Sequence, residues 1–270
     1  MSPLPSPASR GTGSPGTSLL EVSGLSKRFG GLQAVKDVSF RVEQGMVKAL
    51  IGPNGAGKTT LFNLLSGVVP PDAGTVLLRG EPVEGCPPHR IAARGVSRTF
   101  QQIRLFAQMS ALENVMVGAH PRSRAGFVAG MFHLPWTWTE ERDIERRARE
   151  ALEFVGAADL ADADATSLSY GQQRAVELAR ALAADPELLL LDEPAAGLNM
   201  RETADLAKLI RRVRERGITT LIVEHDMGLV MGVSDEVAVL SYGEKIADGT
   251  PRAVQRDPEV IRVYLGDDAC

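Results

Sequence analysis

The stretch GPNGAGKTT, at positions 52–60, constrains the fold of this chain more than any other feature. It fits the pattern G-x-x-x-x-G-K-[ST], in which successive backbone N–H groups turn toward the phosphates of a nucleotide. A largely apolar run precedes it at 47–51, and apolar residues follow at helical spacing within 59–66. Strand, loop and helix in this order are the context that the pattern requires. We therefore expect a phosphate loop made of Gly52, Pro53, Asn54, Gly55, Ala56, Gly57, Lys58, Thr59 and Thr60.

A triphosphate in such a loop needs positive charge near its β and γ groups, and Lys58 supplies it. The Thr59 hydroxyl is a candidate ligand for Mg²⁺. The simpler alternative is a glycine-rich turn with a surface lysine, which the flanking strand and helix patterns disfavour. The sequence thus predicts a site for ATP and Mg²⁺.

A second apolar run, at 188–191, delivers two carboxylates at its C-terminal end. Such unbroken runs are typical of buried parallel strands, and ligands bind beyond the carboxyl ends of these strands in open α/β sheets. We expect Asp192 to hold Mg²⁺, usually through water, and Glu193 to orient the attacking water. A solvated Asp-Glu pair at the start of a turn is the alternative. An amphipathic helical pattern at 201–216 and a strand-like run at 219–223 complete an α/β pattern.

The rest of the chain divides by composition and periodicity. We expect a disordered tail at 1–18, which is rich in Pro, Gly and Ser, followed by a nucleotide-binding domain at 19–270. This domain is expected to contain antiparallel strands at 19–42, an inserted helical subdomain at about 101–167 and a C-terminal helix at about 257–266. A formal net charge of −4 argues against a dedicated nucleic-acid binder. With only 2 cysteines the chain is not expected to form a disulfide framework, which favours reduced thiols and a cytoplasmic location. We expect neither a signal peptide nor a membrane span.

The stretch LSYGQQR at 168–174 lies just upstream of LLLLDEP at 188–194, and together with the phosphate loop these stretches resemble the ABC ATPases. The resemblance covers about 19–266. It implies a P-loop NTPase fold with an N-terminal antiparallel β subdomain and an inserted α-helical subdomain. It also implies that two cassettes sandwich two nucleotides head to tail.

The resemblance assigns further roles to residues that match the family's motifs. Gln101, in RTFQ, resembles the loop glutamine near Mg²⁺ that couples nucleotide state to the partner, and His225, in VEHD, resembles the switch histidine that contacts the γ-phosphate. A lone histidine is more often structural, but its place after an apolar strand favours the switch role. Glu193, His225 and Gln101 are thus the expected catalytic residues. Phe29 occupies the position where the family stacks an aromatic ring on adenine; a core phenylalanine is the alternative.

Residues Ser169, Gly171 and Gln172 match the family's signature motif. A helix begins here, and its free N–H groups and positive dipole end suit an anion, which in the family is the γ-phosphate bound by the other subunit. Tyr170 replaces the commoner Gly of the motif, and Asn199 stands where Asp is more frequent.

Several stretches resemble one branch of the family, the larger ATPase of branched-chain amino-acid importers: RTFQQIRLF, DEPAAGLN, VEHDMGLVMGVSD and RVYLG. This implies a peripheral protein on the cytoplasmic face of the cell membrane. Its expected partners are membrane permease subunits, a second ABC ATPase in a hetero- or homodimer and, indirectly, an extracytoplasmic substrate-binding protein. The segment 119–139, with Trp136 and Trp138, is a candidate permease-docking face, although these rings more simply pack the subdomain.

Three alternatives stay open on the sequence alone. The cargo of the importer could instead be an amide, urea or another small carboxylate, because a cassette does not touch its cargo. A soluble machine for DNA repair or ribosome action is disfavoured, since the chain has one cassette, an acidic balance and no sustained heptads. A regulatory subunit without hydrolysis is disfavoured by Glu193.

Overall fold

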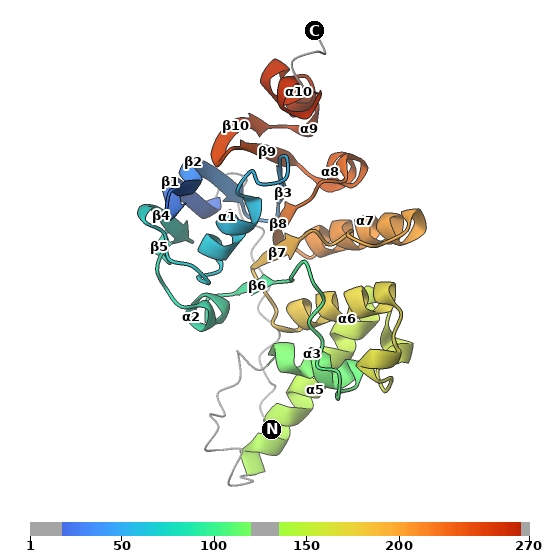
Figure 1. The fold of residues 1–270 in the computed structure, drawn as a ribbon. Helices are drawn as coiled ribbons and strands as arrows, with labels where there is room; N and C mark the ends of the chain where they lie inside the picture. The colour runs from blue at the N-terminus through green and yellow to red at the C-terminus, as the bar shows by residue number, and fades with distance from the viewer. Residues whose placement is uncertain (1–17, 120–134, 266–270) are drawn as a thin grey trace.

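The computed structural model describes residues 18–119 and 135–265, which form two β-sheets flanked by helices (Figure 1). The predicted disordered tail, apart from its last residue, and most of the candidate docking segment 119–139 lie outside the described residues. Both remain predictions.

The smaller sheet is antiparallel, with strand order β2-β1-β4-β5. Strands β1 (Ser18–Phe29) and β2 (Leu32–Glu43) pair along most of their length, and β4 (Ala73–Leu78) pairs with the other edge of β1. The short β5 (Glu81–Pro82) pairs with β4. Alternating buried and exposed residues, as in the second half of β2, face the core and the solvent in turn. The prediction of antiparallel strands at 19–42 is confirmed.

The larger sheet has strand order β10-β9-β3-β8-β7-β6. Strands β6 (Val96–Arg98), β7 (Leu188–Asp192), β8 (Thr219–Val223), β3 (Val47–Ile51) and β9 (Glu236–Ser241) run parallel, and only the edge strand β10 (Glu244–Gly249) is antiparallel to its neighbour. All five residues are buried in each of the three central strands β7, β8 and β3. This burial on both faces explains why their sequences are apolar runs rather than alternating ones. The α/β prediction is confirmed.

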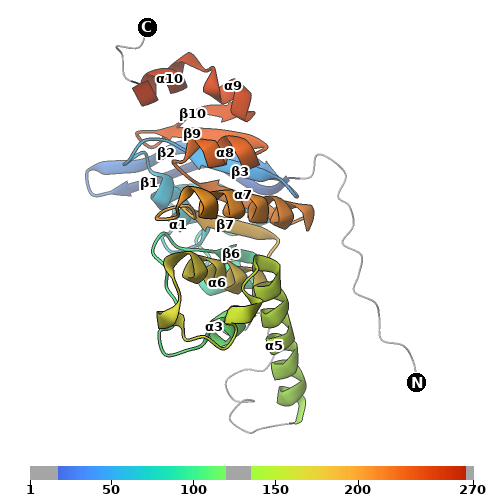
Figure 2. The same ribbon diagram turned by 90° about the vertical axis from the view of Figure 1, so that its right-hand side faces the viewer.

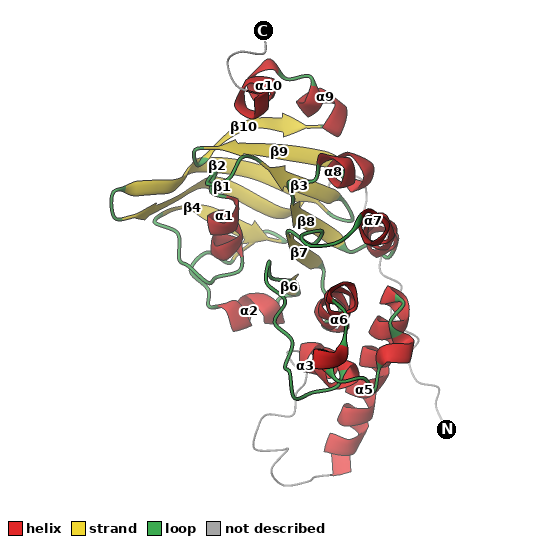
Figure 3. Cartoon of the chain, turned by 45° about the vertical axis from the view of Figure 1, so that its right-hand side comes forward, coloured by secondary structure: helices red, strands yellow, loops and turns green. Residues whose placement is uncertain are grey.

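Helices cover both faces of the larger sheet (Figures 1 and 3). Helix α1 (Lys58–Leu65) packs between the two sheets, where Leu61 and Phe62 share one core cluster with residues of both. Helices α7 (Met200–Glu215) and α8 (Met227–Val233) cover the opposite face, as Figure 2 shows. The C-terminal helices α9 (Pro251–Gln255) and α10 (Pro258–Leu265) pack on the same core cluster through Val254 and Val260. Asp257 accepts a hydrogen bond from the Glu259 N–H and so caps α10.

A third core cluster joins α3 (Ala111–Ala119), α5 (Pro135–Val155) and α6 (Tyr170–Ala183). Two short 3-10 turns, Ala158–Leu160 and Ala165–Ser167, connect α5 to α6. The small α2 (Pro88–Ala93) lies before β6. Since α6 contributes Val176, Ala179 and Ala183 to this core, the helical packing continues beyond position 167. Among the described helices, none has the length and apolarity needed to cross a membrane.

Candidate functional site

The phosphate loop joins β3 to α1 and requires glycine at two positions. Gly57 has φ +99°, and a Cβ there would lie 2.3 Å from the carbonyl oxygen of Ala34. At Gly52, a Cβ would lie 2.1 Å from the carbonyl oxygen of Leu240. Helix α1 begins without any side-chain cap, so its first N–H groups stay available to a ligand.

Lys58 lies at the centre of this loop. Its Nζ donates hydrogen bonds to the carbonyl oxygens of Gly52, at 2.6 Å, and Pro53, at 2.9 Å. Burial lowers the pKa of the Lys58 ammonium, while the nearby charges of Glu193 and Asp192 act in the opposite direction. The ammonium therefore contacts the loop and is influenced by both carboxylates, and the negative charge of a bound phosphate would offset the cost of its burial.

The loop borders a pocket of about 560 Å³. The predicted residues that line this pocket are Asn54, Gly55, Ala56, Gly57, Lys58, Thr59, Thr60, Gln101 and Glu193. Gly52 and Pro53 do not line the pocket but accept the two hydrogen bonds from Lys58. The other lining residues are Leu32, Gln33, Ala34 and Tyr242.

The expected adenine platform, Phe29, is not among the lining residues. Its ring is 48% exposed at the end of β1, with the Lys27 ammonium 5.7 Å from its centre. Tyr242, which sequence reasoning did not select, lines the pocket and is 90% exposed. Tyr242 lies in the turn after β9, and the sequence around it does not predict that it lines the same pocket as the phosphate loop.

The two acidic residues lie at the C-terminal end of β7, where Glu193 lines the phosphate-loop pocket and Asp192 does not. Asp192 is buried and accepts a hydrogen bond from Arg98 Nη2 at 2.8 Å. Glu193 has φ +46°, an uncommon conformation for this residue type that is concentrated at functional sites. Its Oε2 accepts a hydrogen bond from Gln101 Nε2 at 2.8 Å and lies 4.0 Å from His225 Nδ1. The structure thus brings together all three predicted catalytic side chains.

Glu224 organises the backbone around His225. Its buried carboxylate accepts hydrogen bonds from the N–H groups of Ala195, at 2.8 Å, His225, at 3.0 Å, and Asp226, at 3.2 Å. It therefore joins the loop after β7 to the loop after β8. Sequence reasoning missed Glu224, although a carboxylate at the end of an apolar strand was the available signal.

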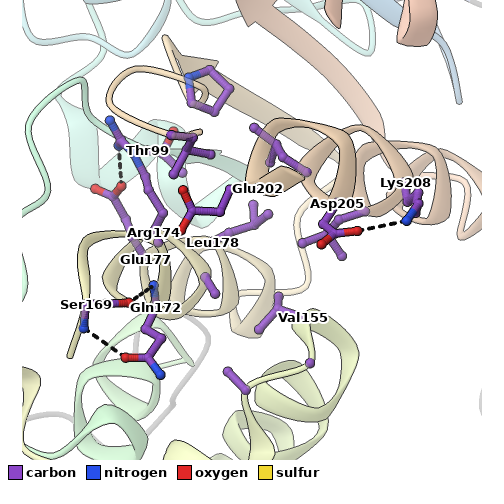
Figure 4. A pocket seen from close by; sticks show the side chains of 18 of the residues that line it. Thr99, Val155, Ser169, Gln172, Arg174, Glu177, Leu178, Glu202, Asp205 and Lys208 are labelled. Carbon is purple, nitrogen blue, oxygen red and sulfur yellow. Dashed lines mark hydrogen bonds and ion pairs between the residues drawn. The ribbon is translucent and has the colours of Figure 1, made fainter. Parts of the chain in front are cut away.

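The signature residues lie at the start of α6, away from the phosphate-loop pocket. They border a second pocket of about 480 Å³ between α6 and α7 (Figure 4). Ser169 Oγ accepts a hydrogen bond from the Gln172 N–H, and Gln172 Oε1 accepts one from the Ser169 N–H. A Cβ on Gly171 would lie 2.5 Å from Glu202 Oε1, so a carboxylate also approaches this helix end. The predicted nucleotide residues thus fall at two separate places within one chain.

The expected metal ligands offer a threonine hydroxyl, an amide and a carboxylate: Thr59, Gln101 and Asp192. Hard oxygen donors of this kind suit Mg²⁺. No group of three or more His, Cys, Asp or Glu side chains poised to hold a metal occurs in residues 18–119 and 135–265. Asp192 is buried and paired with Arg98, so these residues do not form a complete coordination shell by themselves. They fit a Mg²⁺ ion that is held jointly by protein, substrate and water.

Comparisons with known proteins decide the family. Residues 35–196, more than half of the chain, match the family described as "ABC transporter". The chain is 48% identical over 250 residues to the high-affinity branched-chain amino acid transport ATP-binding protein BraF of Pseudomonas aeruginosa, covering 92% of this chain and 98% of that protein. This chain belongs to the ABC transporter ATP-binding family.

Other relatives agree. The family member LivG of Escherichia coli, also described as a high-affinity branched-chain amino acid transport ATP-binding protein, is 46% identical over 92% of this chain and 98% of its own length. The structure of the ADP conformation of MJ1267, an ATP-binding cassette of an ABC transporter, matches with a TM-score of 0.80 and 33% identity, over 93% of this chain and 99% of that one. Residues 244–270 match the family described as "Branched-chain amino acid ATP-binding cassette transporter". The ABC ATPase is therefore an α/β P-loop NTPase, as predicted, and it is an ATP-hydrolysing enzyme.

Proposed function

We propose that this ABC ATPase powers the uptake of branched-chain amino acids through membrane permease subunits. Near full-length similarity to BraF and LivG carries the proposal, because the match includes the C-terminal segment 244–270 as well as the nucleotide-binding motifs. The chain would act on the cytoplasmic face of the cell membrane, paired with a second ABC ATPase. An extracytoplasmic substrate-binding protein would select the cargo. The other cargoes that the sequence left open are not favoured by these similarities.

ATP binding rests on the phosphate loop. The N–H groups at the start of α1 and the Lys58 ammonium hold the phosphates. The exposed ring of Phe29, which does not line the pocket of the single chain, is the proposed stacking partner of the adenine. Thr59, Gln101 and Asp192 are the proposed ligands of Mg²⁺, which when bound neutralises charge between the β- and γ-phosphates. Ser169, Gly171 and Gln172 complete the site of the partner cassette.

Hydrolysis rests on Glu193. Its carboxylate accepts the proton of the attacking water, and the amide of Gln101, 2.8 Å from Glu193 Oε2, holds this carboxylate in place. His225, whose Nδ1 lies 4.0 Å from Glu193 Oε2, is the proposed contact of the γ-phosphate and the attacking water. The three hydrogen bonds from backbone N–H groups to Glu224 support this placement of His225.

The decisive experiment uses the purified ATPase with its co-purified permease in lipid vesicles. ATP turnover is measured with and without a binding protein loaded with leucine, isoleucine or valine. Stimulation by the loaded binding protein supports the proposed importer. If the binding protein leaves ATP turnover unchanged whichever of these three amino acids it carries, the proposed cargo is wrong.

The Glu193→Gln variant tests the chemistry separately. It retains ATP binding, while turnover falls about 10²- to 10⁴-fold, because a general base contributes that much to such reactions. The exposed Glu81→Gln variant is the matched control and keeps normal turnover. Parental turnover in Glu193→Gln would show that the assigned base is wrong.

A further inference from the structure

Helix α6 carries a buried ion pair one turn after the signature residues. Arg174 Nη1 donates a hydrogen bond to Glu177 Oε2 at 2.8 Å, and the two side chains are only 7% and 1% exposed (Figure 4). Both border the pocket between α6 and α7. The proposed function uses neither residue.

The pair holds the backbone of the loop that carries Gln101. Arg174 donates from Nη1 to the Phe100 carbonyl oxygen at 2.8 Å and from Nη2 to the Gln101 carbonyl oxygen at 2.6 Å. Glu177 Oε1 accepts a hydrogen bond from the Phe100 N–H at 3.4 Å. Because Gln101 Nε2 in turn donates to Glu193, an unbroken series of contacts runs from α6 to the proposed general base.

The energetics indicate that stability alone does not explain this pair. Desolvation of two charges commonly offsets their attraction, and apolar residues of similar size are often as stable or more so. Burial raises the pKa of the Glu177 carboxyl, and the charge and hydrogen bonds of Arg174 oppose that shift. Arg174 Nε is buried without a hydrogen-bond partner, so the guanidinium is incompletely satisfied.

We propose that Arg174 and Glu177 are positioning residues that fix the Gln101 loop to the signature helix. A displacement of α6 then moves the Gln101 amide relative to the Glu193 carboxylate. The start of the same helix is the part of this chain proposed to meet the nucleotide of the partner cassette. The pair thereby links engagement of that nucleotide to hydrolysis at this chain's own site, an inference that rests on the roles proposed for Gln101 and Glu193.

The test replaces both charges with apolar side chains of similar length. In the Arg174→Met/Glu177→Met variant, the protein stays folded in a urea titration, because removal of two desolvated charges partly offsets the loss of the hydrogen bonds to the backbone of Phe100 and Gln101. Its kcat for ATP falls about tenfold or more while its KM stays within about twofold, because misplacement of a catalytic group affects the chemical step. Parental kcat in this folded variant would overturn the proposal, since a purely structural pair would be replaceable.

The matched control is the exposed pair Asp205–Lys208 on α7, which borders the same pocket with its charges 2.8 Å apart. The Asp205→Asn/Lys208→Gln variant keeps parental kcat and KM. If the buried double variant fails to fold, Arg174→Lys replaces it. That change keeps a charge beside Glu177 but removes the fork that reaches two carbonyl groups, so kcat falls; parental kcat would again overturn the proposal.

A double-mutant cycle with Gln101→Ala separates this inference from the proposed function. If the pair acts through Gln101, its effect on kcat largely disappears in the Gln101→Ala background. Additive effects, or a Gln101→Ala variant with parental kcat, would overturn the positioning role. The Glu193→Gln variant reports independently on the proposed base, so either assignment can fail while the other stands.

Discussion

Helices α1 and α6 both begin at motifs predicted to hold phosphate, yet their N-termini differ. The start of α1 has no side-chain cap, follows the left-handed Gly57 and opens onto the pocket beside Lys58. At the start of α6, a reciprocal capping box between Ser169 and Gln172 already engages two N–H groups. The start of α1 leaves its N–H groups free to bind an anion, while the start of α6 satisfies two of its own donors.

This difference matches the two proposed tasks. The phosphate loop receives ATP directly, so its donors need to be available in the single chain. The signature helix is proposed to meet a phosphate only when a second cassette approaches, and without the capping box its first N–H groups would depend on water until then. The capping box stabilises α6 in the unpaired chain, and the incoming phosphate would have to compete with it.

The largest expected contrast comes from adding one methyl group to each terminus. Gly57→Ala forces a left-handed alanine against a backbone carbonyl 2.3 Å away, so the loop must distort. We expect the free energy of unfolding to fall by about 1–3 kcal/mol and ATP binding to weaken by at least about tenfold. In Gly171→Ala the added methyl group meets only the flexible end of the Glu202 side chain, which can move aside. The free energy of unfolding therefore falls by less than about 1 kcal/mol.

Urea unfolding and calorimetric ATP titration of the two variants measure this contrast. Equal loss of ATP affinity in both would contradict it, because Gly171 does not border the phosphate-loop pocket.

Local periodicity explains what the sequence could predict. The strand β7 follows from an unbroken apolar run, and the helices α1 and α7 follow from apolar residues at helical spacing; the structure confirms all three. The nine-residue phosphate loop was also predictable as a sequence pattern, although the contacts of Gly52 and Gly57 with the Leu240 and Ala34 carbonyl groups were not.

Contacts between distant segments were not predictable from those patterns. Arg98 pairs with Asp192 across 94 positions of sequence, and Arg174 reaches the Phe100 carbonyl across 74. The Ser-x-x-Gln spacing at the start of α6 did contain the capping box, but it also fits an anion site. A pattern of residue types does not show which of two hydrogen-bonding states a helix end adopts.

A smaller effect distinguishes the capping role of Ser169 from its proposed role in binding the phosphate of the partner cassette. Ser169→Ala removes the side chain that caps α6, so the free energy of unfolding falls by about 1 kcal/mol. ATP affinity of the isolated chain stays unchanged, while turnover of the paired cassettes falls. The control Ser167→Ala changes an exposed serine in the preceding 3-10 turn and affects neither ATP affinity nor paired turnover. Weaker ATP binding by isolated Ser169→Ala would contradict the separation of the two termini.

The smallest expected effect concerns the charge balance at α1. Burial lowers the pKa of Lys58 from its usual 10.5, whereas Glu193 raises it. ATP binding needs the ammonium and therefore weakens as pH rises through the Lys58 pKa. Glu193→Gln removes a charge that raises this pKa, so ATP affinity begins to fall at a lower pH. At one alkaline pH, the variant loses about threefold more ATP affinity than the parent.

Titration of a fluorescent ATP analogue across an alkaline pH series measures this shift of the affinity profile, with the exposed Asp159→Asn as a charge-matched control. Identical pH profiles in Glu193→Gln and the parent would mean that Glu193 does not influence the proton on Lys58.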